Sequence, residues 1–258
     1  MIKAAFFDID WTLYDHRSKR WIPSGIEAIK KLKENGVKVF LCSARPYDSQ
    51  YLFGVFDLGI DWDGYIASAG AIAVVGEKTI RKQLMDVSDA KKMCDKMRQL
   101  GKVCEVVMPK GRFMTGPSDE YVEAYTGVYW YILPPVKPYE GEETTGLLLF
   151  LPQELDETVH SVCPNLAWFR FHEAAVDVSP VIHKKGEAIE DVLSYLGRKK
   201  EEAISFGDDY KDISMAEHTG IFVCMGNGKE EVKAAATYVT KRVEEDGIEH
   251  ALKRFGLI

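Results

Sequence analysis

The stretch Lys3-Ala-Ala-Phe-Phe-Asp8-Ile-Asp10-Trp-Thr-Leu13 decides the fold. Residues 3–7 form a short and almost unbroken apolar run, which is typical of a strand buried in a parallel sheet with helices on both faces. Two aspartates follow this run, and open α/β sheets bind ligands beyond the carboxyl ends of their strands. Because they are two residues apart, Asp8 and Asp10 can converge on one hard cation. Alternatively, both can have a structural role in capping or in a turn. The stretch thus predicts a buried strand with a candidate site at its end.

Strand and helix patterns alternate on both sides of a central segment. Apolar residues recur at helical spacing over residues 23–35, and Gly36 is placed to end that helix. Further strands are predicted at 37–42, 64–68, 203–206 and 221–224, and further helices at 186–196, from 213, and at 248–255. This alternation predicts an α/β fold with a doubly wound parallel sheet.

The pattern changes between about residue 82 and about residue 181. An amphipathic helix over residues 90–100, with Ser88 as its N-cap, precedes strand-like runs at 103–108, 129–133, 146–151 and 166–171. Helices are also predicted at 118–125 and 153–162. We therefore expect an inserted α+β module at 82–181 and a discontinuous core at 1–81 and 182–258. The aromatic residues of the module are interpreted as its own core: Tyr129, Trp130, Tyr131, Trp168 and Phe169.

Composition limits the partners. A net charge of −7 opposes nucleic-acid binding, which needs a basic surface, but it is compatible with a small phosphate ester. The five cysteines are odd in number and contain no CxxC pair, which favours reduced thiols in a cytoplasmic protein. No segment has the pattern of a secretion signal or a membrane span, so no membrane partner is expected.

Residues 8–13 resemble the DxDxT signature of the haloacid dehalogenase (HAD) superfamily, whose core is Rossmannoid. The resemblance implies that Asp8 attacks phosphorus to form an aspartyl-phosphate, while Asp10 protonates the leaving alcohol and later activates water. Thr12 would hold the turn beside the substrate. Ser43, in Leu41-Cys-Ser-Ala-Arg45, matches the second motif and would bind the phosphoryl group, although Ser is also a preferred N-cap. Arg45 is either a substrate contact or an ion-pair residue.

Two later segments match the remaining motifs. Lys185 would neutralise the nucleophile and the phosphoryl oxygens, with Lys184 as the competing assignment. Gly207-Asp-Asp-Tyr-Lys-Asp212 resembles the fourth motif, and it implies Asp208 as a metal ligand with Asp212 orienting the groups around it. The implied cofactor is Mg²⁺, held by Asp8, Asp10 and Asp208.

The chain is similar to the Cof-type subfamily, in which an α+β (C2B-type) cap lies between the second and third motifs. We expect the module at 82–181 to be this cap and to close over the core, with hinges near 79–84 and 179–183. Four positions depart from the family pattern: Trp11 replaces a common Gly, Ala44 replaces Gly, Ala69 replaces Asn, and Lys211 replaces Asn. Lys211 is expected to lie within reach of the phosphate and the metal.

These features predict a Mg²⁺-dependent phosphatase that acts on a small phosphorylated metabolite, either a sugar phosphate or a cofactor precursor. A phosphohexomutase-like phosphotransferase is an alternative, because capped relatives of similar plan move phosphate between sugar positions. A catalytically impaired protein that binds phosphate ligands is another, and the four departures would be its signature.

Overall fold

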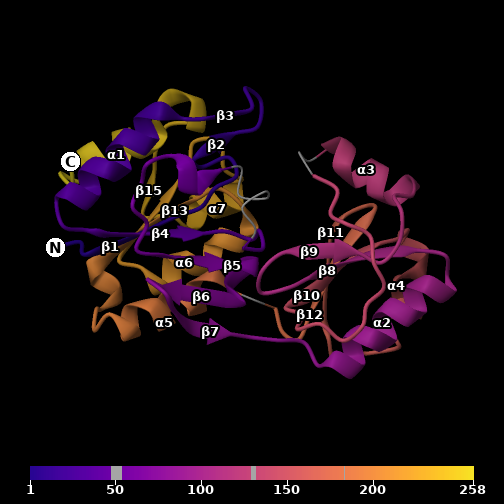
Figure 1. The fold of residues 1–258 in the computed structure, drawn as a ribbon. Helices are drawn as coiled ribbons and strands as arrows, with labels where there is room; N and C mark the ends of the chain where they lie inside the picture. Colours follow the sequence, from indigo (N-terminus) through magenta and orange to yellow (C-terminus); the bar gives the residue numbers. More distant parts are fainter. Residues whose placement is uncertain (48–53, 129–131, 183) are drawn as a thin grey trace. The chain divides into compact units, whose positions relative to one another are not determined.

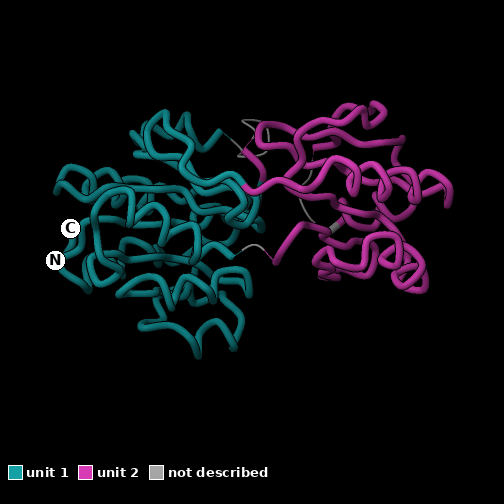
Figure 2. Tube along the Cα trace, turned by 90° about the horizontal axis from the view of Figure 1, so that it is seen from below, with its two compact units in different colours: residues 1–45, 54–82, 184–258 teal, residues 46–53, 83–183 magenta. Residues whose placement is uncertain are grey.

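The computed structural model describes residues 1–47, 54–128, 132–182 and 184–258. The chain divides into two compact units (Figure 2). The first unit comprises residues 1–45, 54–82 and 184–258, and the second comprises 46–53 and 83–183. The chain therefore leaves the first unit twice, once after Arg45 and once after Lys82.

An eight-stranded sheet forms the centre of the first unit, in the order β15-β14-β13-β1-β4-β5-β6-β7. The strands from β15 to β5 are parallel, and β6 and β7 add an antiparallel edge. The five predicted strands are present, whereas β6, β7 and β15 were not predicted. The bounds are β1 (Ala4–Phe7), β4 (Lys38–Cys42), β5 (Gly64–Ala67), β6 (Ile72–Val75), β7 (Lys78–Lys82), β13 (Ala203–Gly207), β14 (Ile221–Cys224) and β15 (Tyr238–Val239).

The first strand is buried on both faces, as its apolar run predicts. Phe6 stacks on Phe40 of β4 with ring centroids 5.2 Å apart, and Phe7 stacks on Phe206 of β13 at 4.9 Å. Successive side chains of a strand point to opposite faces, so both faces of the sheet need a cover. Burial on both faces fits a strand in the interior of the sheet, and β1 lies there between β13 and β4.

Helices cover the two faces of this sheet (Figure 1). On one face α5 (Lys185–Tyr195), α6 (Ile213–His218) and α7 (Glu230–Ala235) pack around Phe6 and Phe40. On the other, α1 (Pro23–Glu34) packs against α8 (Gly247–Arg254), where Gly25 lies against Ile248. The predicted doubly wound α/β core is therefore confirmed. A small hairpin of β2 (Tyr14–Asp15) and β3 (Arg20–Trp21) follows β1.

The second unit is an α+β module with its own core. Its antiparallel sheet has the order β11-β12-β10-β8-β9. Apolar side chains of the sheet, such as Phe113 and Leu149, form one core cluster with Met97 of helix α2. The bounds are β8 (Val103–Val107), β9 (Arg112–Met114), β10 (Gly146–Phe150), β11 (Ala167–His172), β12 (Ala175–Ser179), α2 (Val87–Gln99), α3 (Glu120–Val128) and α4 (Asp156–His160). Single-turn 3₁₀ helices occur in both units at Val55–Asp57, Ser68–Gly70, Gln153–Leu155, Lys200–Glu202, Tyr210–Asp212 and Val243–Glu245.

Some local predictions for this module were wrong. Asp86, not Ser88, caps α2, because its carboxylate accepts the Ser88 N–H at 2.7 Å. The helix expected at 153–162 is a 3₁₀ turn followed by the short α4. Trp168 packs against the core, but Phe169 is 42% exposed, since neighbours on a strand face opposite ways. Tyr129, Trp130 and Tyr131, with most of the predicted strand 129–133, lie outside the described residues.

All five cysteines are buried free thiols. Across the described part of the chain, no helix combines the length and the apolar character needed to cross a bilayer.

Candidate active site

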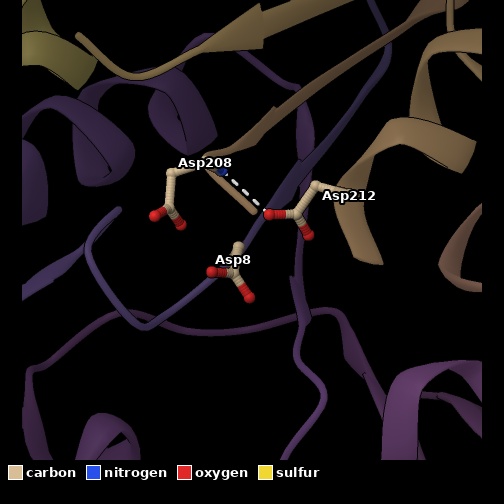
Figure 3. Close-up of side chains that lie close together, drawn as sticks. All are labelled: Asp8, Asp208 and Asp212. Atoms are coloured by element: carbon tan, nitrogen blue, oxygen red, sulfur yellow. Dashed lines mark hydrogen bonds between the residues drawn. The ribbon is translucent and has the colours of Figure 1, made fainter. Parts of the chain in front are cut away.

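Two carboxylates leave adjacent parallel strands at the same edge of the sheet. Asp8 follows β1 and Asp208 follows β13, and the preceding residues Phe7 and Phe206 are paired in register. With Asp212 from the turn after β13, they form a group whose ligand oxygens all lie within 4.8 Å of one another (Figure 3). Their residues are 5%, 9% and 1% exposed, respectively. Three acidic groups thus share a region that solvent hardly reaches.

Lys185, the first residue of α5, supplies a buried cation to this group. Its Nζ donates hydrogen bonds to Oδ1 of Asp8 and to Oδ1 of Asp212, both at 2.6 Å. The next residue must be glycine, because a Cβ on Gly186 would lie 2.1 Å from the carbonyl oxygen of Ser214 in α6. The structure therefore places Lys185 against the predicted nucleophile, whereas Lys184 is exposed.

Asp212 fixes the groups around it. Its Oδ2 accepts the backbone N–H of Asp208 at 2.9 Å and of Asp209 at 3.0 Å, while its Oδ1 accepts from Lys185. Gly207 makes this possible, since a Cβ there would lie 2.5 Å from the Asp212 carboxylate. Both oxygens of Asp212 are thus committed to orienting the backbone of Asp208 and the ammonium of Lys185.

The electrostatics of the group are unbalanced. Burial raises the pKa of Asp8 to about 8, and Lys185 offsets only part of this effect. Burial, then repulsion by Asp8 and Asp212, raises the pKa of Asp208 well above its ordinary value. Burial alone would lower the pKa of Lys185, but Asp212 and Asp8 outweigh it and raise that pKa. The group holds more negative charge than one lysine compensates.

This donor set fits a divalent cation. Burying uncompensated carboxylates is costly, and a hard cation with oxygen ligands relieves that cost. Asp8 and Asp208 are the residues that could hold Mg²⁺ through their side chains, because Asp212 is already bonded through both oxygens.

Asp10 lies outside this three-acid group among the described residues. Arg45 grips its carboxylate with Nε 2.8 Å from Oδ2 and Nη2 2.7 Å from Oδ1, and His16 Nε2 lies 2.6 Å from Oδ1. Burial would raise the pKa of Asp10, but Arg45 and the hydrogen bond with His16 hold it well below its usual range. Of the two alternatives for Arg45, the structure shows the ion pair. Both oxygens of the Asp10 carboxylate contact Arg45 or His16, and metal binding by this carboxylate stays a prediction.

Ser43 and Thr12 are both buried near these residues in the chain. Ser43 follows β4, and its Oγ accepts the Arg45 N–H at 3.1 Å, so it stabilises a turn and caps no helix. The Thr12 N–H donates to the Ile9 carbonyl oxygen at 3.3 Å. Its hydroxyl, however, is buried without a hydrogen-bond partner among the described residues, so Thr12 holds the turn through its backbone and not through its hydroxyl.

Two of the family departures fall at left-handed backbone positions. Trp11 has φ +58° and Ala69 has φ +54°, a region that glycine and asparagine tolerate better than other residues. The family's common Gly and Asn at these positions thus have a conformational reason. Ala44 is exposed, and nothing in the structure explains that departure. Lys211 lies half-buried in the turn Tyr210–Asp212, one residue before Asp212, and its reach to a phosphate stays a prediction.

The contact of His16 with Asp10 was not predicted from the sequence. The two residues are six positions apart, and the hairpin that brings them together has strands of only two residues. Such short strands give almost no periodic signal. Asp is a common turn residue, so Asp15 was the signal in the sequence that could have indicated this hairpin. In the structure its carboxylate accepts the N–H groups of Arg17 and Ser18.

Comparisons with known proteins cover almost the whole chain. Residues 5–252 match the family model of haloacid dehalogenase-like hydrolases. The protein YkrA of Bacillus subtilis is 33% identical over 260 residues, which cover 99% of this chain and 98% of YkrA. The HAD subclass IIB sugar phosphatase BT4131 has a TM-score of 0.83 at 34% identity, covering 99% of this chain and all of that one. A hypothetical protein from Geobacillus kaustophilus has a TM-score of 0.91 at 29% identity, with both chains fully covered.

Proposed function

Since the chain belongs to the haloacid dehalogenase-like hydrolases, we propose that it hydrolyses phosphate monoesters of small metabolites, with Asp8 as the nucleophile and Mg²⁺ as the cofactor. The observation that carries the proposal is the contact of Lys185 Nζ with Asp8, 2.6 Å long, inside a buried group of three carboxylates at the end of β1. A solvated surface lysine would not be buried there. The chain is a phosphatase of this family, so a binding module without chemistry is disfavoured.

The reaction proceeds in two displacements. In the first, an oxygen of Asp8 attacks phosphorus, the bond to the ester oxygen breaks, and the departing alkoxide takes a proton from Asp10. In the second, Asp10 removes a proton from water, the resulting hydroxide attacks phosphorus, and the Asp8 carboxylate leaves with inorganic phosphate as the product. Asp10 enters the first displacement protonated and regains that proton from water in the second, so proton and charge balance over the cycle. Because the contact with Arg45 favours the carboxylate form, this contact has to weaken before Asp10 can act as the acid.

The chain's own groups bind and orient the phosphate. Lys185 supplies a point charge beside the attacking carboxylate, and Asp212 keeps that ammonium in place. The Ser43 hydroxyl, at the end of β4 beside β1, would donate to a phosphoryl oxygen while it accepts from Arg45. Mg²⁺, held by Asp8 and Asp208, would supply positive charge that lets a phosphate dianion approach a carboxylate.

We assign the second unit, residues 46–53 and 83–183, the role of the cap that the sequence predicted at 82–181. Its core separates it from the first unit as an independently packed module. Closure of such a module over Asp8 would exclude water and strengthen the electrostatics of the site. The similarity to the sugar phosphatase BT4131 favours a sugar phosphate or a compound of similar size as the substrate.

The test is an assay of p-nitrophenyl phosphate hydrolysis with Mg²⁺ and with excess chelator, followed by a screen of phosphorylated metabolites. We expect turnover that requires the added metal, and one class of metabolite that is hydrolysed in preference to the others. Absence of turnover under all metal conditions would overturn the proposal. Equal turnover with and without chelator would remove Mg²⁺ from it.

A further inference from the structure

The Asp10 carboxylate contacts two side chains that have no role in the reaction described above. Arg45 and His16 contact both of its oxygens at 2.6–2.8 Å. Both side chains are largely buried, at 16% exposed for Arg45 and 14% for His16. Two partners from different segments therefore fix the rotamer of Asp10.

His16 is itself held in place. Its ring packs on Trp11 at 5.2 Å between centroids and edge-on against Tyr14 at 5.0 Å. Asp15 closes the hairpin turn beside it by accepting the N–H groups of Arg17 and Ser18. Trp11 keeps φ +58°, which costs a non-glycine residue roughly 1–2 kcal/mol, and its ring makes a contact with His16 that glycine could not make. Support of His16 is such a contribution.

The two partners of Asp10 differ in what they can do. A guanidinium only donates hydrogen bonds, so the contact of Arg45 with both oxygens fits the carboxylate form, and a protonated Asp10 would keep its carbonyl oxygen as an acceptor for Arg45. An imidazole nitrogen donates or accepts, depending on the tautomer, so His16 can keep its contact when Asp10 carries a proton as well. The contact with His16 is thus compatible with Asp10 as acid in the first displacement and as base in the second.

We infer that His16, supported by Trp11 and Tyr14, is a positioning residue that aims the Asp10 carboxyl group at the leaving oxygen. This rests on the proposed function, because it needs Asp10 as the proton donor. Correct placement of a general acid within hydrogen-bond reach is what gives it its effect on rate. The loss of His16 should therefore matter most for esters whose alcohol cannot depart without a proton.

The test compares two esters in the same enzyme. An alkyl ester such as glycerol 1-phosphate needs the proton, whereas p-nitrophenolate departs without it. The constant kcat/KM reports only the steps up to the first displacement. It therefore measures Asp10 as the acid of that displacement, separately from its role as the base in the hydrolysis of the aspartyl-phosphate. We expect His16→Ala to lower kcat/KM for the alkyl ester at least about tenfold more than for p-nitrophenyl phosphate, a part of the 10²–10⁴ that general acids supply.

Two further variants keep the test decisive. His16→Gln should recover part of the alkyl-ester activity, because its amide can still donate to or accept from Asp10. Arg20→Ala removes an exposed cation from the same hairpin and should leave both constants unchanged. Thermal melts check that each variant is folded.

Equal losses on both esters in a folded His16→Ala enzyme, or no loss on either, would overturn the inference and leave the proposed function standing. A wild-type protein that is inactive on both esters would instead overturn the proposed function, and this inference with it.

Discussion

Each unit buries charged side chains, but the two regions balance their charges differently. In the second unit Arg112 and Glu105, 3% and 2% exposed, form one ion pair in which Nη1 lies 2.9 Å from both carboxylate oxygens. Nη2 of the same arginine donates to the Ile132 carbonyl oxygen at 2.7 Å. In the first unit three carboxyl groups of the active site share the ammonium of Lys185. The pair in the second unit is neutral, whereas the active site has more acidic groups than Lys185 can compensate, and the pKa values of Asp8 and Asp208 are raised.

The difference separates a structural contact from a functional one. A pair whose two charges compensate each other needs no counter-ion from solution. An excess of buried negative charge is unfavourable in the free protein and becomes favourable only when a cation or a phosphate-bearing complex arrives. Shifted pKa values of this kind concentrate at functional sites, as those of Asp8 and Asp208 do. Removing one carboxylate should therefore lower the stability of the protein when it is taken from the neutral pair, and should not lower it when it is taken from the active site.

The largest effect should come from Asp8→Asn. The amide keeps the shape of the side chain but cannot act as the nucleophile, so turnover of p-nitrophenyl phosphate should fall on the order of 10⁴-fold or more, the scale of losing a catalytic nucleophile. Because the change also removes a charge from the crowded group, the free protein should melt no lower than wild type. Steady-state assays with Mg²⁺ and a thermal melt measure both. More than trace activity would remove Asp8 from the reaction.

Removing one charge from the neutral pair should instead destabilise the protein. Glu105→Gln leaves Arg112 buried without its counter-ion, and breaking a buried pair in this way costs about 3–5 kcal/mol of the free energy of unfolding. Replacing both partners at once, with Glu105→Leu and Arg112→Met, should recover most of this loss, since apolar residues of similar volume can substitute for such pairs. Urea denaturation of the single and double variants tests the claim. A double variant as unstable as the single one would show that the charges themselves are required.

A smaller change is expected when one charge is taken from the active site. Asp208→Asn relieves repulsion, so without metal it should raise stability by about 1 kcal/mol, or roughly 2–4 °C in Tm for a protein of this size. The same variant should lose the stabilisation that Mg²⁺ gives wild type. Asp209→Asn is the matched control, because that carboxylate is exposed and pairs with Lys229. A normal Mg²⁺-induced shift in Asp208→Asn would place the metal elsewhere.

The sequence predicted what lies at strand ends and missed what depends on contacts between distant segments. Asp8 and Asp208 each follow a strand with a clear apolar pattern, so their meeting at one sheet edge was foreseeable, whereas Lys185 was assigned through the family resemblance. The orientation of Asp10 was not, because it depends on Arg45, 35 residues away, and on a hairpin with two-residue strands. Phe169 was misassigned to the core for a different reason. An aromatic run shows that a strand exists but not which of its side chains face inward.

The smallest effect concerns Lys211, which tests how far the excess negative charge of the active site extends. It occupies the family's usual Asn position in the turn before Asp212 and is half-buried. If its ammonium reaches the site, it repels the metal and attracts the phosphate, so Lys211→Asn should tighten Mg²⁺ binding and weaken substrate binding. Each change should be roughly two- to fivefold, the scale of a partly exposed charge pair. Mg²⁺ titrations of activity at fixed substrate, and substrate titrations at saturating Mg²⁺, separate the two constants. Added salt should shrink both changes, because screening weakens partly exposed charges first. Unchanged constants would remove Lys211 from the site.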